Sequence, residues 1–305
     1  MSVRSFTIKL NLDDEPSVKR FFADHGFEFR DLNHGFWQAR GPGCNASFYR
    51  SGKLLIQGKE AEVYRGLLGD VTADARPYHR ALTRHPQPAP KTWLGTDEAG
   101  KGDYFGPLVV AGAVVYREQL ELMVELGVDD SKAISDAKIF EIEAAIKHVC
   151  PHEVLFIGPE KYNELYERMG NLNRLLTWCH CKVIENQLSA NQTRPIEWVL
   201  VDQFVKEAPF RRGLGQLGAQ VPLALWPKAE SDPAVAAASV LARAAYLRGV
   251  ERLSQRFGVR LRPGAGQPTL QAGREFLSQH GLDALKLVAK YHFDTTRQLT
   301  RSDGV

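Results

Sequence analysis

The chain has 305 residues, of which 44% are hydrophobic and 25% are charged, an ordinary composition for a soluble globular protein with room for two domains. Its formal net charge of +3 permits a polyanionic partner without demanding one. No apolar run approaches the roughly 20 residues that cross a bilayer. The 4 cysteines suggest no disulfide framework, so we expect a cytoplasmic protein with no membrane partner.

Residues 1–75 predict a small α+β domain, because short alternating segments and two helical patterns follow one another closely. The predicted strands are 6–12, 35–40, 46–50 and 53–58, and the predicted helices are 13–24 and 60–68. Acids and a proline at 13–16 favour the start of the first helix.

Aromatic and basic side chains interleave in the strands of this domain. They are Phe36, Trp37, Arg40, Phe48, Tyr49, Arg50 and Lys53. A sheet face that carries both kinds suits a nucleic acid duplex or exposed bases. About half of the aromatic side chains must instead fill the core of so small a unit, and the pattern does not say which half.

Residues 76–91 have a different composition from their neighbours. Prolines stand at positions 77, 86, 88 and 90, with basic residues between them. This composition predicts an extended, solvated linker. A spacer is the simpler interpretation, although the charges could touch a phosphate backbone.

From residue 92 to residue 305, strands alternate with helices, which predicts a mixed α/β sheet flanked by helices. The predicted strands are 91–96, 108–116, 153–158 and 197–202. The predicted helices are 121–126, 136–149, 159–170, 171–188 and 233–257. The last helix begins at a proline and is rich in alanine, so we expect it to pack closely on the sheet.

Asp97 and Glu98 follow an apolar strand and precede the turn Gly100-Lys101-Gly102. Such a strand brings carboxylates to the edge of a sheet, and the glycines let the backbone approach a phosphate or a sugar. The turn matches neither the dinucleotide-binding fingerprint nor a P-loop. We therefore expect metal-dependent chemistry on a phosphodiester and no nucleotide cofactor.

Two further acidic positions favour the same interpretation. Asp202 ends a second apolar strand, and Glu230 and Asp232 stand just before the alanine-rich helix. Carboxylates that converge without histidine suit two hard cations such as Mg²⁺ or Mn²⁺, which bind the attacking and leaving oxygens of a phosphodiester. Taken singly, Asp202 could cap a turn, and Glu230 or Asp232 could cap the helix.

Cys179-His180-Cys181 also invites a metal interpretation. The spacing is shorter than that of zinc ligands, and no second ligand pair accompanies it. Because the segment lies in a helical pattern, we interpret the cysteines as buried thiols.

Several linked motifs resemble the type 2 ribonuclease H family, and ribonuclease HIII in particular. They are Gly95–Ala111 with its Gly102-Asp103-Tyr104-Phe105-Gly106-Pro107 continuation, Asp130-Ser131-Lys132, Val201-Asp202-Gln203-Phe204, Lys228-Ala229-Glu230 and Ala234–Arg243. The N-terminal segment 48–59 is similar to the TATA-binding-protein-like domain that ribonuclease HIII carries and ribonuclease HII lacks.

The resemblance implies an RNase H-like fold and endonucleolytic cleavage of the RNA strand of RNA/DNA hybrids. It also implies Mg²⁺ or Mn²⁺ as cofactor and products with 5′-phosphate and 3′-hydroxyl ends. Asp97, Glu98 and Asp202 match the family's metal-binding acids, and the fourth acid is Glu230 or, if the motif shifts, Asp232. The residues expected to contact substrate are Gly100, Lys101, Gly102, Ser131, Lys132, Lys228 and Lys53.

Three other functions compete with this one. A ribonuclease HII-like enzyme would nick at single ribonucleotides in duplex DNA. A silent hybrid-binding module would lack one of the acids, and all are present. A strand-transfer or resolving nuclease on the same fold would act on DNA. We expect a monomer in each case.

Overall fold

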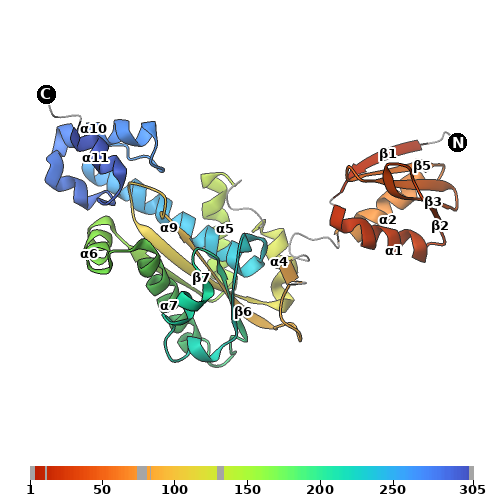
Figure 1. Cartoon of the computed structure of the whole chain (residues 1–305), viewed down its shortest axis with the longest axis horizontal. Coiled ribbons are helices and arrows are strands. Elements are labelled where there is room, and N and C mark those ends of the chain that lie inside the picture. Colours follow the sequence, from red (N-terminus) through yellow and green to blue (C-terminus); the bar gives the residue numbers. More distant parts are fainter. Residues whose placement is uncertain (1–3, 11, 74–80, 83, 129–133, 302–305) are drawn as a thin grey trace. The chain divides into compact units, whose positions relative to one another are not determined.

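The computed structural model describes residues 4–10, 12–73, 81–82, 84–128 and 134–301 (Figure 1). The chain divides into two compact units, Met1–Arg80 and Ala81–Val305. Asp130, Ser131 and Lys132, which carry one of the predicted motifs, lie outside the described residues.

The N-terminal unit contains a five-stranded antiparallel sheet in the order β1-β5-β4-β3-β2. Its strands are β1 (Arg4–Lys9), β2 (Glu28–Arg30), β3 (Gly35–Gly41), β4 (Cys44–Tyr49) and β5 (Lys53–Gly58), and its helices are α1 (Glu15–Asp24) and α2 (Ala61–Ala73). The predicted elements are present, and the short edge strand β2 is an addition. Side chains that alternate along the strands fill one core with those of α1 and α2.

The structure shows which aromatic side chains of this sheet are buried. Trp37 and Phe48 stack in the core with a centroid separation of 5.8 Å. Phe36 is 41% exposed, and Tyr49 is half-buried. Arg40 and Lys53 are exposed, so the face away from the core carries the basic groups.

The second unit is built on a mixed five-stranded sheet in the order β10-β9-β6-β7-β8. The strands are β6 (Thr92–Ala99), β7 (Leu108–Tyr116), β8 (His152–Ile157), β9 (Trp198–Asp202) and β10 (Leu223–Trp226). The helices are α4 (Leu120–Glu125), α5 (Asp136–Val149), α6 (Pro159–Met169), α7 (Leu172–Ala190), α8 (Glu207–Arg211), α9 (Pro233–Phe257), α10 (Gln267–Ala284) and α11 (Asp294–Arg301). β6 pairs antiparallel with β7 and parallel with β9.

Helices cover both faces of this sheet (Figure 1). One face packs against α9, which lies close to the backbone of Gly95 on β6. A Cβ atom added at Gly95 would lie 2.2 Å from main-chain atoms of Ala234 and Val235, so only glycine lets the helix sit there. The opposite face of the sheet packs against α7, where Val183 contacts Gly112 of β7. The predicted close packing of the alanine-rich helix is confirmed, with Ala236, Ala237 and Ala238 buried.

The C-terminal part of the predicted linker 76–91 is buried at some positions and exposed at others. Ala81, His85 and Pro90 are buried, and the second unit begins at Ala81. The imidazole of His85 lies 4.6 Å from the ring of Trp198, centroid to centroid. Aromatic contacts therefore attach this proline-rich stretch to the unit that follows it. Within the described parts of the chain, no helix is long and apolar enough to span a membrane.

Candidate active site

The ends of β6 and β9 bring two acids to one edge of the central sheet. The strands run parallel, with Thr96 opposite Val201. Asp97 and Asp202 are the next residues on the two strands, so they stand side by side where β9 ends. The negative charge of Asp202 also contributes to raising the pKa of Asp97, which is consistent with two carboxylates that lie close together. The sequence prediction that these two residues meet is consistent with this register.

Asp97 lies on the face of the sheet that packs against α9. Side chains alternate along a strand, so Asp97 shares the face of Gly95. Ser239, further along the same helix, hydrogen-bonds the Asp97 carboxylate, and Oδ1 also accepts from the backbone N–H of Glu98 at 2.8 Å. Helix α9 therefore covers this face of the sheet and also provides a hydrogen bond to Asp97.

Glu98 faces the opposite side, toward α7. His180 of that helix connects the strand residues: its Nε2–H donates to Glu98 Oε2 at 3.2 Å, and its Nδ1 is hydrogen-bonded to the Thr96 hydroxyl at 2.9 Å. Lys101 Nζ donates to the other carboxylate oxygen at 3.2 Å. Cys179 and Cys181 are buried free thiols, as interpreted from the sequence. The histidine between them, which the sequence argument set aside, is a direct partner of a predicted metal ligand.

A backbone hydrogen bond connects Asp202 to the segment that carries Glu230. Asp202 Oδ1 accepts from the backbone N–H of Ala229 at 2.8 Å. This bond places the short 3₁₀ turn Ala229–Ser231 beside the end of β9. Glu230, the next residue, is half-buried in that turn. Its position follows from a chain reversal at Lys228, which adopts a left-handed conformation with φ of 54°.

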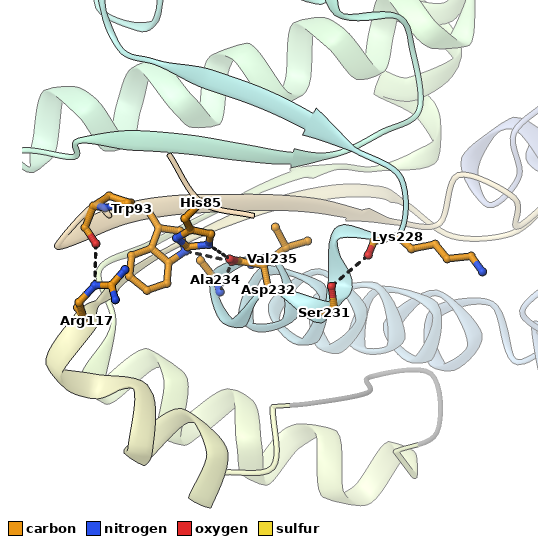
Figure 2. A network of polar contacts seen from close by, with 9 residues as sticks. His85, Trp93, Arg117, Lys228, Ser231, Asp232, Ala234 and Val235 are labelled. Atoms are coloured by element: carbon orange, nitrogen blue, oxygen red, sulfur yellow. Dashed lines mark hydrogen bonds and ion pairs between the residues drawn. The ribbon is translucent and has the colours of Figure 1, made fainter. Parts of the chain in front are cut away.

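Asp232 has a different environment, which Figure 2 shows. Its carboxylate is fully buried, and Oδ2 accepts from His85 Nε2–H at 2.7 Å. Oδ1 accepts from the indole N–H of Trp93 at 3.0 Å and from the backbone N–H of Ala234 at 2.9 Å, which caps α9. Trp93 precedes Asp97 by four residues, which is about 13 Å along an extended strand. Asp232 therefore hydrogen-bonds residues at the beginning of β6 and of α9, away from Asp97.

The turn that follows β6 has an exposed tip and a buried base. Gly102 is exposed and Lys101 is half-buried, whereas Tyr104, Phe105 and Gly106 are buried. Gly100 has φ of +85°, and a Cβ atom there would lie 2.2 Å from the carbonyl oxygen of Pro107. The backbone thus needs glycine at this point to fold back on itself.

The remaining predicted substrate residues are dispersed. Lys228 is exposed beside the Ala229–Ser231 turn. Lys53 is exposed on β5 of the N-terminal unit. Ser131 and Lys132 belong to the stretch that the structure does not describe.

The pKa values of the two neighbouring acids, Asp97 and Glu98, are shifted in opposite directions. Burial, followed by the charge of Glu98, raises the pKa of Asp97 above its ordinary value, and the Ser239 hydrogen bond only partly opposes this. Burial also acts to raise the pKa of Glu98, but His180 and Lys101 outweigh it and leave the pKa below its ordinary value. A nearby cation would favour the charged form of Asp97.

The donor set fits a hard divalent cation, because Asp97, Glu98, Asp202 and Glu230 offer only carboxylate oxygens. Among the described residues, no three acidic, histidine or cysteine side chains are already grouped as ligands of one ion. Each of Asp97, Glu98 and Asp202 is held by a protein donor instead.

Known proteins resemble this chain over nearly its whole length. The family model described as ribonuclease HII matches residues 94–296. Ribonuclease HIII of Chlamydia abortus is 34% identical, over 94% of this chain and 95% of the relative. Ribonuclease HIII of Protochlamydia amoebophila is 35% identical, over 96% of each. A crystal structure of Bst-RNase HIII in complex with Mn²⁺ is 29% identical and superposes with a TM-score of 0.71 over 99% of both chains.

The fold and these matches define the class: the chain belongs to the type 2 ribonuclease H family, whose members are metal-dependent endoribonucleases that act on RNA/DNA hybrids. Within that family it belongs with ribonuclease HIII, because the similarity extends through the N-terminal unit. The predicted RNase H-like fold and hydrolase activity are confirmed.

Proposed function

We propose that this chain cuts the RNA strand of RNA/DNA hybrids and leaves 5′-phosphate and 3′-hydroxyl ends. The observation that carries the proposal is the parallel register of β6 and β9, which sets Asp97 beside Asp202 at one sheet edge. We assign metal binding to Asp97, Glu98, Asp202 and Glu230. Two bound Mg²⁺ or Mn²⁺ ions would supply an activated water and a counter-charge for the phosphodiester.

The protein's own groups orient these acids. Ser239 and the Glu98 backbone N–H fix Asp97, and His180 fixes Glu98. The backbone N–H of Ala229 fixes Asp202. Such partners orient metal-binding carboxylates much as a second ligand shell does.

Glu230 is a better fourth acid than Asp232. Glu230 adjoins Ala229, the residue bonded to Asp202, and is half-buried. Both oxygens of Asp232 are occupied by donors from His85, Trp93 and the start of α9. Freeing Asp232 for a metal ion would strand these buried donors.

The turn after β6 is the proposed contact to the RNA strand. Gly102 is exposed, Lys101 is half-buried and Gly100 is buried just before them, so Gly100-Lys101-Gly102 offers backbone groups and a cation at the tip of the turn. The 2′-hydroxyl is the local group that distinguishes RNA from DNA. Ser131, Lys132 and Lys228 are proposed phosphate contacts. Lys101 already pairs with Glu98, so substrate binding and the metal site share a residue.

The N-terminal unit is proposed as a TATA-binding-protein-like substrate-binding domain over residues 1–75, joined by 76–91 to a catalytic domain over 92–305. Support comes from the outer face of its sheet, where Arg40 and Lys53 are exposed and Phe36 adds an accessible ring. Basic groups next to an accessible ring suit a nucleic acid backbone and its bases.

A nuclease assay with three substrates tests the proposal. Labelled RNA/DNA hybrid, double-stranded RNA and double-stranded DNA are offered in parallel with Mg²⁺ or Mn²⁺. We expect cleavage of the RNA strand of the hybrid only, products that a ligase requiring a 5′-phosphate accepts, and no cleavage after chelation. Equal cutting of DNA would contradict the proposal.

A ribonuclease HII-like activity is the second candidate, favoured by the ribonuclease HII family model over residues 94–296. A DNA duplex with one embedded ribonucleotide separates the two. Ribonuclease HIII-type activity predicts rapid cleavage within a longer RNA tract and slow cleavage at the single ribonucleotide. The reverse preference would favour the second candidate.

We also propose that the enzyme acts as a monomer in the cytoplasm. All four proposed metal-binding acids come from one unit of one chain. The cysteines of the chain are free and buried, which suits a reducing compartment. Light scattering across a concentration series and cell fractionation test these two statements.

A further inference from the structure

Lys290 is a fully buried lysine that lies outside the group of acids. Its Nζ donates to the backbone carbonyl of Asp103 at 2.8 Å and to that of Gly106 at 2.9 Å. The ammonium also lies 5.5 Å from the ring centroid of Tyr162. A buried charge is costly unless it is hydrogen-bonded, and here its hydrogen-bond acceptors are the two ends of one turn.

That turn, Asp103–Gly106, is the buried base of the loop that follows β6. The backbone N–H of Tyr104 donates to Gly264, and the carbonyl of Tyr104 accepts from the N–H of Lys290 at 2.8 Å. The N–H of Gly106 donates to the carbonyl of Val288 at 2.9 Å. The segment before α11 therefore binds the turn through its backbone. Of the three carbonyls that this backbone pairing leaves, Lys290 binds those of Asp103 and Gly106, and the Tyr246 hydroxyl donates to that of Phe105.

The exposed tip of the loop is continuous with this base. The N–H of Asp103 donates to the carbonyl of Gly100 at 3.4 Å, so residues 100–103 form one tight turn. A shift of the base would therefore also move Gly102 and Lys101, which directly precede Asp103 in the chain. No apolar side chain at position 290 could supply the same two bonds, because both acceptors are carbonyl oxygens.

We propose that Lys290 is a positioning residue that holds the Asp103–Gly106 turn and thereby fixes the backbone of Gly100-Lys101-Gly102 for the RNA strand. The inference rests on the proposed function, because it concerns the loop assigned there to substrate. Lys290 itself touches neither the acids nor the tip of the loop in the contacts described above. Its effect should appear in substrate binding before it appears in the chemical step.

The charge of Lys290 should also make the stability of the closed turn depend on pH. Burial lowers the pKa of Lys290 to about 7, and the carboxylate of Asp103 only partly opposes this. The other ionisable groups that face it are Tyr162 and His292. Burial, followed by the charge of Lys290, lowers the pKa of His292. Opening of the turn would return the Lys290 side chain to water and restore the ordinary pKa of a lysine. Between pH 7 and that ordinary pKa, opening of the turn is therefore accompanied by uptake of a proton. The closed turn is then stabilised as pH rises above 7, by at most about tenfold per pH unit.

The test compares Lys290→Met with Lys161→Met in the full chain. Lys161 is an exposed lysine of α6 that pairs with Glu164, so its loss should change nothing. For Lys290→Met we expect a roughly tenfold higher KM for a defined RNA/DNA hybrid and a kcat within about threefold of the wild type. Lys290→Gln, whose amide can donate to one carbonyl, should give an intermediate KM and serves if the methionine variant does not fold. An unchanged KM in a folded Lys290 variant would overturn the proposal.

Hydrogen exchange at the amides of Tyr104 and Gly106 reads the turn without substrate. After correction for intrinsic exchange, we expect their protection to rise from pH 7 to pH 8.5 in the wild type. We expect it to fall at least tenfold and lose this pH dependence in Lys290→Met. Unaltered protection in the variant would overturn the proposal that Lys290 holds the Asp103–Gly106 turn. Failure of the wild type to cut hybrid would instead refute the proposed function and leave the exchange result intact.

Discussion

The two sheets of this chain have the same number of strands but use their faces differently. In the N-terminal unit, one face fills the core and the other leaves Arg40 and Lys53 exposed. In the second unit, α7 and α9 cover the two faces, and the candidate acids stand at the strand ends. An open face offers a broad surface for contact, whereas a covered sheet restricts chemistry to its edge. Substitutions on the open face of the N-terminal sheet should therefore affect KM, whereas substitutions of the acids at the strand ends of the second sheet should affect kcat.

Asp97→Asn should have the largest effect, because it removes a charge from the sheet edge and keeps the size of the side chain. We expect kcat to fall at least about a thousandfold, while the hybrid still binds with an affinity close to that of the wild type. Single-turnover cleavage and a binding assay measure the two quantities. Asp136→Asn is the control, because Asp136 is an exposed partner of Arg243 at the start of α5. Near-normal turnover in Asp97→Asn would refute the assignment of Asp97.

Glu230 and Asp232 sharpen the comparison within the second unit, because they are two residues apart and have different surroundings. For Glu230→Gln we expect kcat to fall at least about a hundredfold with little change in Tm. For Asp232→Ala we expect a loss of about 3–5 kcal/mol in the free energy of unfolding, since a helix cap is lost and two buried donors are left unpaired. Thermal unfolding and cleavage rates are measured on both variants. A stable, inactive Asp232 variant beside an active Glu230→Gln would reverse the assignment.

Much of this arrangement follows from local sequence signals. Alternation and helical periodicity predicted β6, β7, β9 and α9, because these elements are long and strongly apolar. Strand-end acids predicted that Asp97 and Asp202 would meet. The short strands β2 and β10 escaped prediction, since three or four residues carry little periodicity.

The contacts that the sequence did not indicate are long-range. His180 meets Glu98 across 82 residues, His85 meets Asp232 across 147, and Lys290 meets Asp103 across 187. Each of these basic residues is buried by elements that only the tertiary fold brings together. A lone histidine in an apolar helix, or a lysine near the end of the chain, gives no local sign of its partner. Sequence thus predicted the acids and missed the groups that hold them.

Removal of residues 1–80 tests the comparison between the units most directly. We expect KM for the hybrid to rise about tenfold and kcat to stay within about threefold, because the proposed metal-binding acids all lie in the second unit. Circular dichroism establishes that the shortened chain is folded. An unchanged KM would contradict the binding role of the N-terminal unit. A large fall in kcat would show that this unit contributes to the chemical step.

Lys53→Ala should give the smallest effect and the most specific one. Loss of one phosphate contact should raise KM about two- to threefold and reduce the slope of log KM against log salt by about one. Lys19→Ala is the matched control: Lys19 lies on α1, which packs on the core face of the same sheet, and its ammonium sits 5.6 Å from the ring centroid of Phe29. If both lysines change KM and the salt slope equally, the unit attracts the hybrid only through its net charge. If Lys53 alone does so, the open face of the sheet is the binding surface, and contact and chemistry are divided between the two sheets.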